Sequence, residues 1–162
     1  MTATYDLIGS TVLGSTTTSV TFSSISASYR DLVLVATVRA AATIDGLIRF
    51  NSDTGANYSW VRASGNGSTT ASFGSTTSSI FPNAVAQFDS TNFNSVIVQI
   101  MDYSATDKHK SVLMRGNNPS IGVEMSVARW ANTSAINTIE FRSGSSTQFD
   151  VGSSFYLYGI VS

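Results

Sequence analysis

The sequence contains no cysteine, a single histidine and two prolines among its 162 residues. Without cysteine the chain has no disulfide, no thiol nucleophile and no thiolate ligand for zinc. The one imidazole, His109, lies between two lysines in the polar turn DKHK. A Ser-His-Asp centre needs a histidine held by a buried carboxylate. We therefore expect His109 to be an exposed turn residue.

Charge is also scarce. Only 12% of the residues are charged and the formal net charge is −1, which excludes the basic surface typical of proteins that bind nucleic acid or anionic membranes. No apolar run reaches the roughly 18 residues that a membrane-spanning helix needs. The first residues lack a basic region followed by an apolar core, so we expect no signal peptide. Nucleic acid and membranes are not expected partners.

Acidic motifs are few. Glu124 and Glu140 are the only glutamates, and both occupy positions predicted to face outward from strands, so a glycosidase pair is not indicated. The segment 51–55 (NSDTG) begins like a calcium loop but lacks the later bidentate glutamate of an EF-hand, and an Asx turn fits it better. We expect neither catalysis nor a cofactor or metal.

The sequence does contain 28 serines, 19 threonines and 42% hydrophobic residues, and the hydrophobic ones fall in patterned segments. The run Leu32–Val38 is almost continuously apolar and β-branched, which is typical of a strand buried on both faces at the centre of a sheet. Asn94–Tyr103 has the same character. Both are predicted to be interior strands.

Other segments alternate with period two. In Ile121–Trp130 the alternation predicts that four apolar side chains face the core and two polar ones face solvent: Ile121, Val123, Met125 and Val127 inward, and Glu124 and Ser126 outward.

Ten or eleven short strands, separated by turn signals and uninterrupted by any convincing helix, predict an all-β fold. The spacing favours an antiparallel two-sheet β-sandwich that is jelly-roll-like. A chain of this length forms one domain. We therefore expect a single domain over residues 1–162, with a possible N-terminal arm over residues 1–6.

Two segments are poor in large apolar residues and are our candidates for contact with a partner, namely 1–6 and the serine-rich stretch 65–79. The second is either a long loop or a pair of strands with short side chains. The candidate contact residues are Met1, Thr2, Ala3, Thr4, Tyr5, Asp6, Ser68, Thr69, Thr70 and Phe73. A low-charge surface of this kind is predicted to form a closed homotrimer.

Three large aromatic residues, Tyr58, Trp60 and Trp130, are a candidate surface for stacking a sugar ring. Core or interface packing is the competing interpretation and the favoured one, because large aromatics dominate both environments.

Several fragments occur in an order that resembles small structural proteins of tailed bacteriophage virions, including those of cyanobacterial phages. These fragments are FSSIxxxYRDLVLV (22–35), RFNxDxxxxY (49–58), IMDY (100–103), WxxxxAI (130–136) and GSSFYLYGI (152–160).

The resemblance implies a β-sandwich that acts by assembly and carries no catalytic motif. It implies a place in the virion, either as a head decoration or cement protein on the lattice of the major capsid protein, or as a tail-fibre or baseplate component. A carbohydrate-binding jelly roll is an alternative from a different functional class.

Overall fold

The computed structural model describes residues 4–80 and 87–161, and within these ranges the chain forms eleven β-strands and no helix. No segment of the described chain is a helix able to cross a membrane. The strands are β1 (Tyr5–Val12), β2 (Ser19–Phe22), β3 (Asp31–Val38), β4 (Gly46–Phe50), β5 (Tyr58–Gly65), β6 (Thr70–Thr77), β7 (Asn94–Met101), β8 (Lys110–Asn118), β9 (Gly122–Trp130), β10 (Ile139–Ser143) and β11 (Ser154–Ile160).

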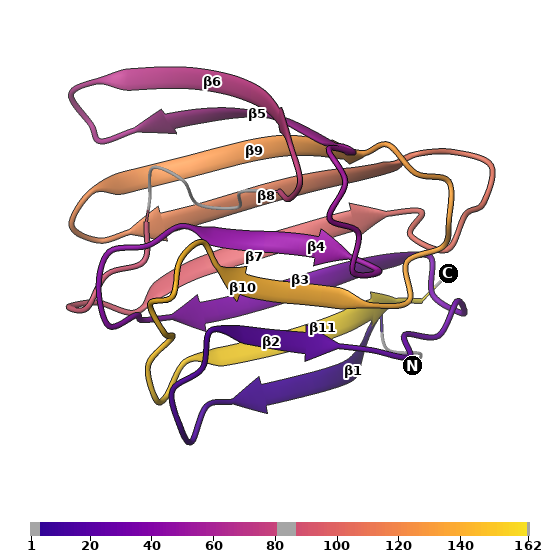
Figure 1. The fold of residues 1–162 in the computed structure, drawn as a ribbon, viewed down its shortest axis with the longest axis horizontal. Helices are drawn as coiled ribbons and strands as arrows, with labels where there is room; N and C mark the ends of the chain where they lie inside the picture. Colours follow the sequence, from indigo (N-terminus) through magenta and orange to yellow (C-terminus); the bar gives the residue numbers. More distant parts are fainter. Residues whose placement is uncertain (1–3, 81–86, 162) are drawn as a thin grey trace.

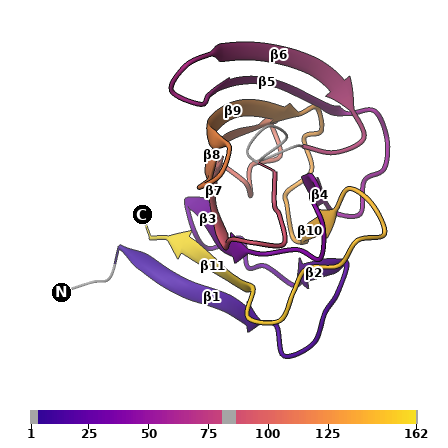
Figure 2. The same cartoon turned by 90° about the vertical axis from the view of Figure 1, so that its left-hand side faces the viewer.

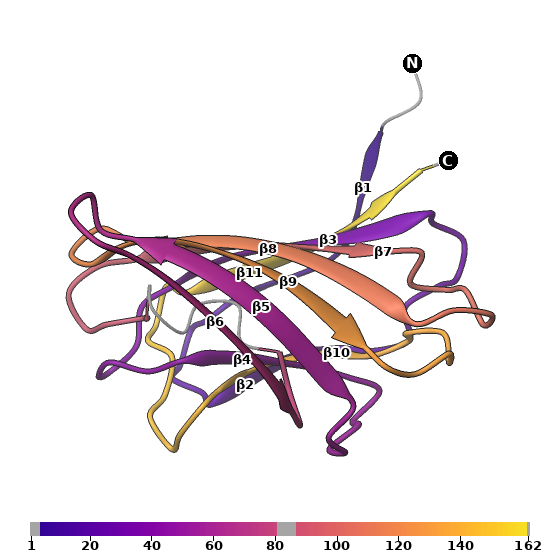
Figure 3. The same cartoon turned by 90° about the horizontal axis from the view of Figure 1, so that it is seen from above.

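The strands make two antiparallel sheets that face each other (Figures 1 and 3). The large sheet has eight strands in the order β1-β11-β3-β7-β8-β9-β5-β6, and the small sheet has three in the order β2-β10-β4. The predicted all-β antiparallel sandwich is confirmed.

The chain winds between the layers as in a jelly roll. Strands β1 to β4 alternate between the large and the small sheet, and β10 and β11 then return between β2 and β4 and between β1 and β3, respectively. Two hairpins, β5–β6 and β8–β9, widen the large sheet beyond β7. Figure 2 shows β5 and β6 at the far end of the large sheet from β1.

The two strands predicted to be interior are interior. Strand β3 lies between β11 and β7, and β7 lies between β3 and β8. On β3 the side chains of Leu32, Leu34 and Ala36 have no solvent exposure. An apolar, β-branched run without proline fits this position, since alternate residues hydrogen-bond to β11 and to β7 and a proline would remove one of these donors.

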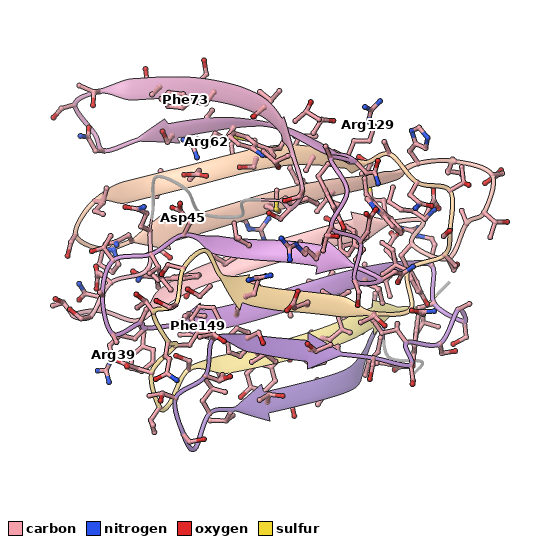
Figure 4. All side chains as sticks on the ribbon, viewed as in Figure 1. Arg39, Asp45, Arg62, Phe73, Arg129 and Phe149 are labelled. Carbon is pink, nitrogen blue, oxygen red and sulfur yellow. The ribbon has the colours of Figure 1, made fainter. Side chains whose placement is uncertain are left out.

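The core between the sheets is rich in aromatic rings. At one end Phe141 of β10 packs against Phe149 and Phe155, with ring centroids 5.7 and 5.3 Å away, and Phe88 joins the same cluster. Phe149, labelled in Figure 4, lies just outside the regular strands and bridges to Thr17 and Ala40. On β4, β10 and β11 alternate side chains are buried, which places Phe50, Phe141 and Phe155 and the neighbouring aliphatic side chains inward.

Candidate interaction surface

The three aromatic residues that were candidates for an exposed surface are buried. Tyr58, Trp60 and Trp130 are 0%, 9% and 1% exposed. The ring of Tyr58 stacks on that of Trp130 with centroids 6.3 Å apart, and the ring of Phe50 lies 5.6 Å from that of Trp130. The prediction of an exposed platform is wrong, and core packing is confirmed, because β5 and β9 pair in a register that sets Tyr58 opposite Trp130 on the inner face.

The polar ends of the Tyr58 and Trp130 rings are hydrogen-bonded within the chain. The Tyr58 hydroxyl accepts a hydrogen bond from the backbone N–H of Phe50 at 3.0 Å and lies 3.3 Å from the carbonyl oxygen of Asp53. Burial raises the pKa of Tyr58 to about 12. The indole N–H of Trp130 donates to Oδ2 of Asp53 at 2.7 Å. The aromatic cluster is therefore tied to the turn that follows β4.

That turn is the Asx turn expected from the sequence. Oδ1 of Asp53 accepts the N–H of Gly55 at 2.8 Å, and Nδ2 of Asn57 donates to the same carboxylate. Burial by itself would raise the pKa of Asp53, but the hydrogen bonds from Asn57, Trp130 and Gly55 outweigh it and lower that pKa. Within the described ranges no group of three or more His, Cys, Asp or Glu residues is placed to hold a metal ion.

The described part of the N-terminal contact segment is not an arm. Residues 1–3, and with them the predicted contacts Met1, Thr2 and Ala3, lie outside the described residues. The carbonyl of Thr4 accepts the N–H of Val161 at 3.1 Å. Tyr5 and Asp6 belong to β1, where they pair with Ile160 and Gly159. An arm extending to residue 6 is therefore wrong, because β11 needs an antiparallel partner on this side.

The serine-rich segment is a strand hairpin rather than a loop. Ser68 and Thr69 form its turn, in which Oδ1 of Asn66 accepts both of their backbone N–H groups at 3.0 and 2.8 Å. Thr70 and Phe73 lie on β6, and all four predicted contact residues are exposed. The long-loop alternative is wrong, and of the predicted strand pair the segment supplies the turn and the second strand, β6, which pairs with β5.

The largest departure from prediction is the orientation of β9. Val123, Met125 and Val127 are 61%, 53% and 51% exposed, whereas Glu124 and Ser126 are 3% and 1% exposed. The five residues of β9 for which a face was predicted all point to the opposite face. Ile121, also predicted to face inward, is exposed in the turn before β9.

Trp130 explains the reversal. Side chains two residues apart in a strand share a face, so fixing Trp130 in the core carries Ala128, Ser126 and Glu124 inward with it. Burial of the Trp130 ring, whose indole N–H donates to Asp53, therefore leaves Val123, Met125 and Val127 on the outer face. Continued to the end of the strand, the predicted alternation places Arg129 in the core and Trp130 in solvent, and this conflict is the signal in the sequence for the opposite face.

The reversal leaves an apolar outer face on the large sheet. One row of directly paired residues crosses all eight strands, and only one of its members is a polar side chain. In sheet order this row is Leu7, Tyr158, Val33, Gln99, Leu113, Val127, Val61 and Gly74. Paired Cβ atoms lie about 4.5–5.5 Å apart, and eight strands spaced about 4.8 Å apart make the row roughly 34 Å long.

The adjacent row adds Tyr156, Val35, Ile97, Met125 and Ala63, with Arg115 among them. At one end of the face the sheet forms a hollow of about 800 Å³, whose lining includes Ala63, Ile97, Met125, Arg115 and the largely buried Glu124. Arg115 and Arg129 are exposed here. Asp31, on the outward phase of β3, is buried in an ion pair with Arg30. In the described chain this face thus exposes cations without carboxylates.

The remaining polar candidates lie apart from one another. His109 is exposed at the turn before β8, as expected. Glu124 is on the inner face of the large sheet, within 3.5 Å of the Ser126 hydroxyl, and its predicted surface position is wrong. Glu140 is half-buried on β10 of the small sheet.

Comparisons with protein-family profiles, with curated proteins and with solved structures gave no match. The resemblance to phage virion proteins therefore rests on the sequence fragments alone.

Proposed function

We propose that this protein is a non-enzymatic structural protein of a bacteriophage virion that binds its partner through the outer face of the large sheet. The exposed apolar row across that face carries the proposal. Monomeric proteins rarely expose contiguous apolar patches larger than a few hundred Å², and larger ones mark interaction surfaces. Antiparallel sheets usually pair one buried apolar face with one polar face, and here the second face is apolar as well.

The resemblance of the sequence to phage virion proteins supports two places for the protein in the particle. The leading role is a head decoration or cement protein bound to the lattice of the major capsid protein, and the runner-up is a tail-fibre or baseplate component. No observation favours a carbohydrate-binding module, since Tyr58, Trp60 and Trp130 are in the core. The homotrimer expected from the composition stays a prediction.

The outer face also constrains the chemistry of the partner. Val61, Leu113 and Val127 require apolar contacts, and the exposed guanidinium groups of Arg115 and Arg129 require acceptors. Charged groups that are desolvated without a partner weaken an interface. The complementary surface therefore combines apolar side chains with carboxylates. A protein bound in this way stabilises a shell by mass action, as far as it binds the assembled state better than free subunits.

The first experiment tests whether the protein is part of the virion and in how many copies. Quantitative mass spectrometry of purified virions should find the protein in hundreds of copies if it covers the capsid, and in far fewer if it belongs to the tail. Its absence from purified virions would contradict the virion assignment.

The face is tested by rebinding to particles that lack the protein. Val127→Asp places a carboxylate at the centre of the apolar row and should abolish rebinding. Thr21→Asp adds the same group to an exposed position on β2 of the small sheet and should rebind normally. Equal rebinding of the two variants would show that the outer face is not the contact.

A further inference from the structure

Strand β6 is an open sheet edge with none of the usual protection. It is eight residues long, exposed along almost its whole length, and pairs with β5 in an unbroken register from Tyr58–Thr77 to Gly65–Thr70. It contains no charged residue and no proline. Natural proteins usually protect such an edge with lysine, proline, a bulge or a very short strand, because an open edge accepts another strand.

The other edges of the two sheets are protected. At the opposite end of the large sheet, β1 carries Asp6 and a register shift between Leu7 and Gly9. In the small sheet β2 has four residues, and β4 is flanked by the bridge from Ile48 to Ile80. Among the described strands, β6 is therefore the edge best suited to strand addition.

The hairpin turn shows which backbone groups of β6 face away from β5. The N–H of Asn66 donates to the carbonyl of Thr69, so this pair is hydrogen-bonded and the pairs beyond it alternate. Residues 71, 73, 75 and 77 then bond to β5. The N–H and C=O groups of Thr70, Ser72, Gly74 and Thr76 point outward, where no described strand meets them.

We propose that β6 pairs with β6 of a second copy of this chain, antiparallel about a two-fold axis at Phe73. This register pairs Ser72 with Gly74 and Thr70 with Thr76 of the other copy, so that all four outward residues exchange their backbone hydrogen bonds. If the two-fold axis lay one residue earlier or later, one of these four residues would pair with a position outside β6. Because the segment is uncharged, no like charges meet when it pairs with itself.

The axis also accounts for an exposed aromatic ring. Phe73 is 49% exposed at the middle of β6, on the same face as Arg62, whose guanidinium carbon lies 4.7 Å from the Phe73 ring centroid and 5.1 Å from that of Trp60. Figure 4 shows Arg62 and Phe73 side by side on β5 and β6. In the dimer Phe73 faces its own copy across a pair that is not hydrogen-bonded, with Cα atoms about 4.5 Å apart. Each ring covers the other.

This inference goes beyond the proposed function and does not depend on it, since it uses the edge of the large sheet rather than its outer face. This two-fold association is an alternative to the three-fold one that the composition predicts, and the oligomeric state of the purified chain distinguishes them. Sedimentation velocity of the purified chain should show a species of twice the 17.1 kDa monomer mass. A monomer at high micromolar concentration, or a trimer, would overturn the proposal.

Single-cysteine variants test the register, because the native chain has no cysteine. Phe73→Cys should form a disulfide-linked dimer under mild oxidation, since the two Cα atoms are within disulfide range. Ser75→Cys is the matched control on the same face of β6; its two copies lie about four residues apart along the strands, roughly 13 Å, and should not crosslink. Equal crosslinking of the two variants, or none with Phe73→Cys, would overturn the two-fold register.

A second test uses the outward N–H groups of β6 and does not depend on the ring of Phe73. Ser72→Pro removes an N–H that points away from β5, so it should convert the dimer to monomer while the circular dichroism spectrum stays unchanged. Ser72→Ala keeps that N–H and should remain dimeric. A Ser72→Pro protein that is folded and still dimeric would place the contact elsewhere; if Ser72→Pro unfolds, Thr76→Pro takes its place with the same expected outcomes.

Discussion

The indole N–H of Trp130 donates to Oδ2 of Asp53 at 2.7 Å, and this bond joins the last residue of β9 to the turn after β4. It links the large sheet to the small one at the end where β9 leaves the sheet. It also fixes which face of β9 is buried, since Trp130 shares its face with Ala128, Ser126 and Glu124. The exposed apolar row on the other face is a consequence of this anchor.

Loss of the Asp53 carboxylate should destabilise the fold. Asp53→Ala removes the acceptor for the Trp130 indole, for Asn57 and for the Gly55 N–H. Leaving such donors unsatisfied costs about 1–3 kcal/mol. Urea denaturation at neutral pH measures the loss. Asp107→Ala, at an exposed position, is the control and should change stability little.

The same carboxylate should give the fold an acid-sensitive component. The pKa of Asp53 is lower in the folded state than its ordinary value, so its stabilisation is fully present above the unfolded pKa of about 3.9. It is lost as the pH falls through the folded pKa. The difference in unfolding free energy between wild type and Asp53→Ala should therefore shrink on acidification below pH 4. A constant difference would show that the charge of Asp53 is not responsible.

Adjacent substitutions on β9 test its orientation. Ala128→Asp places a carboxylate at a site that is 4% exposed and should prevent soluble folding or cost several kcal/mol, because a buried unpaired charge is strongly unfavourable. Val127→Asp, one residue earlier and exposed, should stay within about 1 kcal/mol of wild type. Thermal unfolding compares them. A more stable Ala128→Asp would mean that the face of β9 is assigned wrongly.

Gly159 on β11 should tolerate no side chain while Tyr29 is present. A Cβ at residue 159 would overlap the ring of Tyr29, which lies directly against this glycine. Gly159→Ala should therefore cost about 1–3 kcal/mol, the usual penalty of overpacking. In a Tyr29→Ala background the same substitution should cost much less. Additive effects in this double-mutant cycle would exclude the contact as the cause.

The sequence predicts the scaffold of this protein better than its surface. Leu32–Val38 and Asn94–Tyr103 reveal their interior positions by their apolar, β-branched runs, but burial on both faces is wrong: Val33, Val35 and Ile97 lie half-exposed on the outer face. Period-two alternation identifies a strand but does not always show which of its two faces is buried. In β9 both faces carry residues that could be buried, and the choice depends on Trp130, Asp53 and the pairing of β9 with β5, which are distant in sequence.

The interaction surface was missed for the same reason. Val123, Met125 and Val127 were assigned to the core because they are apolar, although exposed apolar residues are common on protein surfaces and become informative only when they are contiguous. Contiguity with Val61 and Leu113 depends on strand order, which local patterns do not specify. The serine-rich stretch 65–79 does not by itself predict a hairpin, because small polar side chains neither favour nor exclude a strand.

Methionine oxidation in purified virions tests the central claim most directly, since the chain carries its own reference. Met125 is 53% exposed in the hollow of the outer face, whereas Met114, on the neighbouring strand β8, is fully buried. Oxidation to the sulfoxide follows the exposure of the sulfur. In the isolated protein Met125 should be oxidised quickly and Met114 slowly. In the virion Met125 should become protected while Met114 stays slow. Oxidation of Met125 at the same rate in virions as in the isolated protein would contradict the claim that the outer face of the large sheet is buried on assembly.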